Sequence, residues 1–181
     1  MVEASKQPGS SSRIVLVVSD RPAALALDRA ESHGIPTEVV SWTGDRDSFT
    51  RRVCDVVDSY GAESMVLAGF MRILGAEAIA RFPHRIINVH PSLLPAFPGA
   101  HAVEAALEYG VKVAGATVHF VDERVDHGAI IDQRVVSVLA DDTAESLHRR
   151  IQEVEHEILP AAMEALAAGR LEVSDRRVTW R

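Results

Sequence analysis

A short run of residues near the N-terminus, Arg13–Ser19, does most to constrain the fold, because five consecutive residues within it are Ile, Val or Leu. This composition is typical of a strand that is buried on both faces. An Ala- and Leu-rich segment, Pro22–His33, follows and stops at Gly34, as a helix stops at a glycine. Strand and helix signals keep alternating through the first half of the chain, which predicts an α/β fold on a parallel sheet.

The other elements of this first half are short. Strands are predicted at Thr37–Ser41, Ser64–Ala68 and Arg85–His90, and helices at Arg46–Tyr60 and Ala76–Phe82. The first of these helices carries apolar side chains at helical spacing. Cys54, the single cysteine, lies on the same helix and is predicted to be a core residue.

The second half follows a different pattern. Pro91–Gly99 holds three prolines and a glycine, which predicts an ordered loop, and Ala102–Tyr109 is predicted to be a short helix. Lys112–Val121 and Ala129–Val138 flank a turn and are predicted to pair as an antiparallel hairpin.

The longest predicted helix is Thr143–Ala168, which Gly169 ends. Asp142 and Glu145 are predicted to cap its N-terminus, and Pro160 to kink it. Its predicted buried stripe consists of Leu147, Ile151, Val154, Ile158, Ala162 and Leu166.

Composition narrows the class of protein further. The chain has 181 residues, enough for one domain, with 19 Lys and Arg against 26 Asp and Glu. A net charge of −7 argues against a nucleic-acid-binding protein, although a local basic pocket for a small anionic ligand stays open. No apolar run approaches the roughly 20 residues of a membrane helix, no secretory signal is visible, and one cysteine cannot form an internal disulfide. We therefore expect a cytoplasmic protein without a membrane partner.

Two polar side chains that could carry chemistry lie at the end of the predicted strand Arg85–His90. Asn88 and His90 are two residues apart, so their side chains lie on the same face. An amide can hold a developing oxyanion, and an imidazole can donate to it or move a proton, so the pair suits carbonyl chemistry. The alternative is that both residues only cap the sheet.

Asp126 lies at the tip of the predicted hairpin. An Asp at such a position is often only a turn residue. A functional role requires that Asp126 fold back onto His90, where its carboxylate would favour the protonated imidazole. No metal-ligand motif such as HExxH or CxxC is present, so no metal is predicted.

Five segments, in order, resemble the phosphoribosylglycinamide formyltransferase family. They are Leu67–Leu74, Asn88–Pro95, Thr117–Val121, Val125–Gly128, and Glu155–His156 followed by Pro160. The resemblance implies a Rossmann-like α/β fold, with a mostly parallel sheet, helices on both of its faces and the antiparallel hairpin in the second half. It implies one domain, which spans residues 1–181.

The resemblance also implies an activity and a set of roles. Members of the family transfer a formyl group from 10-formyltetrahydrofolate to the amine of glycinamide ribonucleotide in purine synthesis. Asn88 and His90 would stabilise the tetrahedral oxyanion, and Asp126 would tune His90 and help to move protons. The residues implied to bind the folate are Met71, Arg72, Ile73, Leu74 and Val125. Glu155 is implied to contact the ribose of the nucleotide, and Leu94–Pro95 to be a cis peptide bond.

One part of the family pattern is missing at the N-terminal end. The family begins with a strand, a glycine-rich SGxGSN-type loop that holds the nucleotide phosphate, and a helix. Here Val2–Ser5 resembles the end of that helix, Arg13–Ser19 resembles the second strand, and Gly9–Ser12 is interpreted as the loop between them. Residues 1–181 are therefore expected to be incomplete relative to the family.

Several hypotheses stay open at this point. The chain is either a working formyltransferase, a catalytically impaired relative that binds folate, or another enzyme, transferase or deformylase, that uses 10-formyltetrahydrofolate. From the residues alone, an α/β protein that binds some other small anionic ligand is a further alternative. The expected partners are small molecules, and a homodimer is compatible with the sequence.

Overall fold

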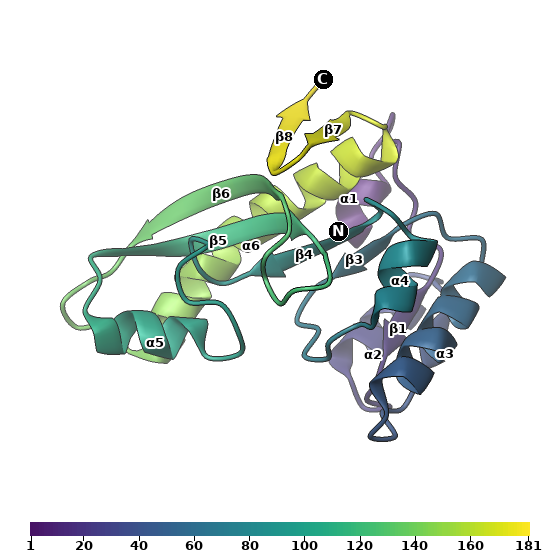
Figure 1. Cartoon of the computed structure of the whole chain (residues 1–181), viewed down its shortest axis with the longest axis horizontal. Coiled ribbons are helices and arrows are strands. Elements are labelled where there is room, and N and C mark those ends of the chain that lie inside the picture. Colours follow the sequence, from purple (N-terminus) through teal and green to yellow (C-terminus); the bar gives the residue numbers. More distant parts are fainter.

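The computed structural model describes residues 1–181 and contains two separate β-sheets (Figure 1). Strands β1 (Val17–Ser19) and β2 (Thr37–Val39) form a two-stranded parallel sheet. Six further strands form a mixed sheet in the order β3-β4-β5-β6-β8-β7. Their bounds are Met65–Leu67 for β3, Ile86–His90 for β4, Val113–Phe120 for β5, Ile130–Ser137 for β6, Leu171–Ser174 for β7 and Arg177–Trp180 for β8.

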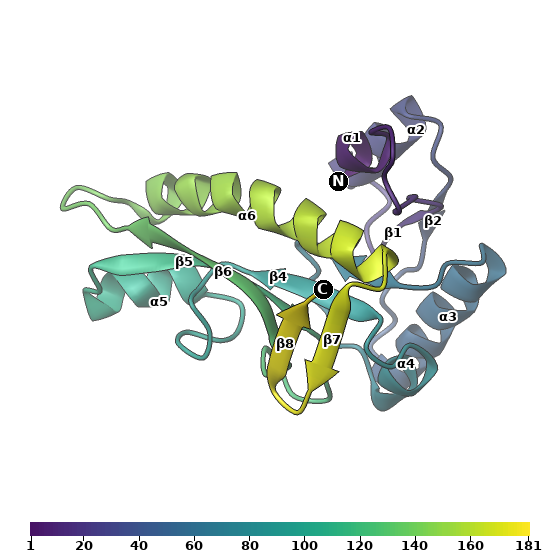
Figure 2. The same ribbon diagram turned by 90° about the horizontal axis from the view of Figure 1, so that it is seen from above.

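Six helices surround these sheets. They are α1 (Val2–Ser5), α2 (Leu25–Ser32), α3 (Arg46–Ser59), α4 (Ala76–Arg81), α5 (Ala102–Tyr109) and α6 (Ala144–Ala167). Helix α2 packs on the two-stranded sheet, α3 packs against α4, and α6 lies along one face of β4, β5 and β6 (Figure 2). The predicted α/β class is confirmed, and α5 has the predicted bounds.

The six-stranded sheet changes from parallel to antiparallel pairing at β4. Strand β3 pairs in parallel with β4, whereas β5 runs antiparallel to both β4 and β6. The predicted hairpin is therefore present. Asn88 lies opposite His119 and His90 lies opposite Thr117, so β5 brings its own polar side chains to the end of β4.

Two hydrophobic cores hold the molecule together. The larger one comprises 16 buried residues and fills the space between the six-stranded sheet and α6, where Leu147 and Ile151 are fully buried. The smaller one lies around α3 and α4 and includes Cys54, which confirms that this cysteine is a core residue. Val18 of β1 and Leu67 of β3 both pack on this smaller core, so it is shared by the two sheets.

The cap of α6 differs from the predicted one. Thr143 is the N-cap residue, and its side chain accepts a hydrogen bond from the Ser146 backbone N–H at 3.1 Å while Ser146 Oγ accepts one from Thr143 N–H at 3.0 Å. Asp142 instead accepts hydrogen bonds from Ser146 Oγ and from the Arg150 guanidinium. The prediction that Asp142 and Glu145 cap this helix is wrong, because the reciprocal pair forms one residue later.

Strand β1 is shorter than the apolar run that predicts it. Only Val17–Ser19 pairs with a neighbour, whereas Arg13–Ser19 was expected to be a buried strand. The edge of β1 away from β2 and the edge of β3 away from β4 have no strand partner. The hairpin β7–β8, for which the sequence gives no strong signal, adds two strands beside β6.

Candidate active site

His90 ends β4 and is 5% exposed. Its Nε2 lies 2.8 Å from the carbonyl oxygen of Phe97 and its Nδ1 lies 3.4 Å from Asp126 Oδ2. Both ring nitrogens thus face acceptors, and only a protonated imidazole can donate to both at once. This placement confines the ring between the loop after β4 and the loop that joins β5 to β6.

Asp126 reaches His90 by folding back along the sheet. Because β5 is antiparallel to β4, the loop that carries Asp126 starts beside the first residues of β4 rather than beside its end. Asp126 adopts a left-handed backbone conformation, with φ of 50°. Its Oδ2 accepts a hydrogen bond of 2.8 Å from the Gly99 backbone N–H.

The carboxyl group of Asp126 is held in its ionised form. Burial acts to raise its pKa, but the nearby His119 ring, the hydrogen bond from the Gly99 N–H and the charge of His90 together lower the pKa below its ordinary value. An ionised Asp126 beside His90 can accept a proton or stabilise an imidazolium.

His119 joins these residues into one network, and sequence reasoning did not single it out. Asn88 Nδ2 lies 3.2 Å from His119 Nε2, while His119 Nδ1 lies 2.7 Å from the Phe120 carbonyl oxygen. His119 Nε2 is also 3.7 Å from Asp126 Oδ1. The available signal was its place in the segment Thr117–Val121, but its position opposite Asn88 depends on a strand register that the sequence does not show.

The loop after β4 is fixed by hydrogen bonds to the hairpin. Thr117 Oγ1 donates to the Ser92 carbonyl oxygen at 2.6 Å and accepts from the Leu94 backbone N–H at 3.0 Å. Gln133 Nε2 donates to the Leu94 carbonyl oxygen at 2.9 Å. The Leu94–Pro95 bond is cis, as predicted.

Three of the residues implied to bind folate expose apolar side chains. Met71 is 64% exposed, and Ile73 and Val125 are each 52% exposed. Leu74 differs from them, because it is 8% exposed and belongs to the smaller core. The Leu74 side chain therefore anchors the segment in the smaller core, whereas the side chains of Met71 and Ile73 form apolar surface on which a ligand could pack.

Arg72 lies between the two sheets. Its Nε donates to Asp20 Oδ2 at 2.8 Å, and its guanidinium carbon lies 5.0 Å from the centre of the Trp42 ring. Asp20 follows β1, whereas Arg72 follows β3, so the ion pair joins the segments that leave the two sheets.

Glu155 lies on α6 and makes no hydrogen bond or ion pair with the network around His90. Burial alone raises the pKa of its carboxyl group to about 7. Such a group favours the protonated form near neutral pH, and an ionised Glu155 would gain most from a ligand that donates hydrogen bonds to it.

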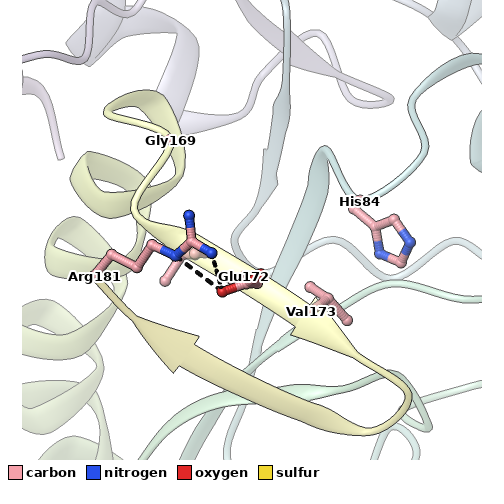
Figure 3. Close-up of a pocket in the computed structure, with 6 residues that line it drawn as sticks. His84, Gly169, Glu172, Val173 and Arg181 are labelled. Atoms are coloured by element: carbon pink, nitrogen blue, oxygen red, sulfur yellow. Dashed lines mark hydrogen bonds and ion pairs between the residues drawn. The ribbon is translucent and has the colours of Figure 1, made fainter.

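The surface also has a hollow that shares no residue with this network. It has a volume of about 330 Å³ and is lined by His84 and by residues near the C-terminal hairpin, including Glu172 and Arg181, which form an ion pair (Figure 3).

No group of three metal-binding side chains is close enough together to hold a metal ion. None of the helices is both long enough and apolar enough to span a membrane.

An amide, an imidazole and an ionised carboxylate that converge on an α/β sheet are groups that can stabilise charge developing on a carbonyl group during acyl transfer. A model of the Formyl transferase family matches residues 1–163, and the chain belongs to this family.

Similar proteins extend this assignment. The chain is 43% identical to the phosphoribosylglycinamide formyltransferase of Mycobacterium tuberculosis, over 92% of this chain and 78% of that protein. It is 43% identical to the trifunctional purine biosynthetic protein adenosine-3 of Gallus gallus, but spans only 18% of that protein's length. The crystal structure of glycinamide ribonucleotide transformylase 1 from Symbiobacterium toebii superimposes with a TM-score of 0.90 at 45% identity, covering 93% of this chain and 80% of that one.

Proposed function

We propose that the chain transfers a formyl group from 10-formyltetrahydrofolate to the amine of glycinamide ribonucleotide. The observation that carries the proposal is the convergence of Asn88, His90 and Asp126, which come from two different segments and meet through His119. The similarity to phosphoribosylglycinamide formyltransferases supports the choice of substrates.

Asn88, His90 and Asp126 have different roles in the transfer. The amine attacks the formyl carbon, so that a C–N bond forms and negative charge develops on the formyl oxygen. The Asn88 amide donates a hydrogen bond to this oxygen, and the His90 ring donates a second one with an N–H that turns to it from the Phe97 carbonyl oxygen or from Asp126. Asp126 takes up the proton that the amine loses, directly or through water, and the bond from the formyl carbon to the folate then breaks. Asp126 returns this proton, directly or through water, to the nitrogen that carried the formyl group, and tetrahydrofolate leaves.

The substrates occupy different parts of the chain in this proposal. The folate ring packs on the exposed apolar side chains of Met71 and Ile73, with Val125 closing from the hairpin loop. Glu155 accepts hydrogen bonds from the ribose hydroxyls of the nucleotide, which offsets the cost of burying its charge. The phosphate lacks a comparable cradle within residues 1–181, because no glycine-rich loop precedes a helix there.

A direct assay tests the proposal. The chain is incubated with 10-formyltetrahydrofolate and glycinamide ribonucleotide, and formylated nucleotide, tetrahydrofolate and free formate are measured together. Formylated nucleotide in amounts equal to the tetrahydrofolate supports the transfer. Formate in place of formylated nucleotide would show a deformylase and overturn it.

The unpaired edges of β1 and β3 favour a second candidate. With these edges unpaired, residues 1–181 by themselves would bind formyl folate but turn over slowly. A titration with a folate analogue separates the two candidates, because the second one predicts binding without formyl transfer. The homodimer remains a proposal that sedimentation of the same preparation would test.

A further inference from the structure

Three residues of the loop that carries Asp126 are linked to one another by hydrogen bonds. They are Asp122, Arg124 and His127, and we call them the loop clasp. Asp122 Oδ1 accepts a hydrogen bond from the Arg124 backbone N–H at 2.9 Å, and Asp122 Oδ2 accepts one from His127 Nδ1 at 2.9 Å. Arg124 Nη1 lies 3.0 Å from His127 Nε2. The clasp therefore joins the start of the loop to the residue next to Asp126.

The hydrogen bonds of the clasp define one form of the His127 ring. Nδ1 faces a carboxylate and must donate, whereas Nε2 faces a guanidinium N–H and must accept. The neutral ring with its proton on Nδ1 satisfies both partners. The charged groups that face it are Asp122, Arg124 and Arg176, whose Nη1 lies 3.3 Å from each ring nitrogen.

Arg176 brings the C-terminal hairpin into this arrangement. It lies in the turn between β7 and β8, and β8 is attached to β6 through the pairing of Arg177 with Ile130. A hydrogen bond of 3.1 Å from Trp180 Nε1 to the Ile131 carbonyl oxygen holds the same strand. The hairpin thus supports the clasp from outside the loop.

Asp126 needs such support because its backbone is strained. A non-glycine residue at φ of 50° costs about 1 kcal/mol, so the loop would relax if nothing held it. On the far side, Gly128 is packed so closely that an added Cβ would lie 1.8 Å from the Phe120 carbonyl oxygen. His127 lies between the strained residue and this contact.

We propose that His127 is a positioning residue that, through its hydrogen bond to Asp122, holds Asp126 against His90 and Gly99. The expected effect on kcat rests on the proposed function, whereas the expected effect on the position of Asp126 does not. His127 touches no reacting atom, and it acts only through the position of its neighbour.

His127→Ala and His127→Asn test the proposal. Asn can place an amide N–H where the ring places Nδ1–H, so it preserves the bond to Asp122 and loses the contacts with Arg124 and Arg176. We expect His127→Ala to lower kcat by about tenfold to a hundredfold, with the KM for formyl folate within twofold, and His127→Asn to recover most of the loss. Glu123→Gln, an exposed position in the same loop, is the matched control and should leave kcat unchanged.

A second measurement does not depend on turnover. The Gly99 amide donates to Asp126, so its hydrogen exchange reports whether Asp126 is in place. We expect exchange at Gly99 to accelerate at least tenfold in His127→Ala and to stay near wild type in His127→Asn and Glu123→Gln. Unchanged exchange in a folded His127→Ala variant overturns the proposal. If the wild-type chain shows no turnover, the proposed function fails, and faster exchange at Gly99 still supports the positioning role. If His127→Ala does not fold, Asp122→Ala removes the acceptor of the same bond, and wild-type exchange at Gly99 in that variant overturns the proposal.

Discussion

The two sheets of this protein differ in how fully their strands are paired and buried. In the six-stranded sheet, β4 is paired on both sides, and seven of the eight residues of β5 are buried. In the two-stranded sheet, β1 pairs on one side only, and its three residues are all partly exposed. The apolar run Arg13–Ser19 nevertheless has the composition of a strand buried on both faces.

This difference separates the candidate site from the two-stranded sheet. The network of Asn88, His90, His119 and Asp126 depends only on β4, β5 and their loops. The two sheets approach one another through Arg72 and Asp20 and through the smaller core, and neither facing edge has a strand partner. The network around His90 is therefore held within one sheet, beside a second sheet whose edge strand lacks a partner on one side.

The largest effect is expected from closing the sheet. An N-terminal extension that encodes an apolar strand and a glycine-rich loop should pair with the free edges of β1 and β3. Each new backbone hydrogen bond contributes about 1 kcal/mol, so several of them should raise the Tm by about 10 °C. The loop should also lower the KM for glycinamide ribonucleotide, because its N–H groups bind phosphate.

The control for this experiment is an extension of equal length made of Gly and Ser. It should change neither the Tm nor the KM. If the 181-residue chain already unfolds cooperatively at the same temperature and turns over as fast as the extended one, the unpaired edges of β1 and β3 cost neither stability nor activity.

His90→Ala should produce the next largest effect, and it changes only the six-stranded sheet, in which β4 is paired on both sides. Loss of the imidazole removes a donor to the developing oxyanion, so kcat should fall at least about a hundredfold. The affinity for a folate analogue, measured by titration, should change little because the exposed apolar residues remain. A variant with near wild-type kcat would exclude His90 from the reaction.

The sequence predicted those parts of the molecule whose signals are local. The stripe of α6 and the bounds of α5 follow from helical spacing and from Gly110, which ends α5 at φ of 80°. The candidates Asn88 and His90 followed from alternation along one strand, and they do lie beside one another at the sheet. The cis bond at Leu94–Pro95 came only from the resemblance.

The parts that were not predicted depend on partners far away in the sequence. His119 could not be identified because its position opposite Asn88 is set by strand register. The strand at Arg13–Ser19 is shortened because pairing, rather than composition, defines a strand. The hairpin β7–β8 has only four residues in each strand and an Asp175–Arg176 turn without glycine, so its local signal is weak.

Asp126→Asn should give a smaller, pH-dependent effect. The hydrogen bond from the Gly99 N–H helps to hold the pKa of Asp126 below its ordinary value, so the wild-type carboxylate is protonated only as the pH falls through this lowered pKa. Asn cannot take up a proton, so kcat should fall, and the acidic limb of the kcat profile that reports protonation of Asp126 should be absent from the variant. A rate and a pH profile identical to those of the wild type would show that Asp126 is only a turn residue.

Glu155→Gln should have the smallest effect, and it examines the region assigned to the nucleotide. Burial raises the pKa of Glu155 to about 7, whereas an unfolded chain has an ordinary Glu pKa near 4.5. The folded state therefore binds the proton more tightly, and the wild-type free energy of unfolding should fall as pH rises between these two values. Gln is neutral throughout, so the variant should gain stability over the wild type between pH 5 and pH 8, by about 1–3 kcal/mol at most. Urea unfolding at several pH values measures this gain. A difference that does not change with pH would mean that solvent reaches the carboxylate freely, and the case for a ribose contact at Glu155 would lose its physical basis.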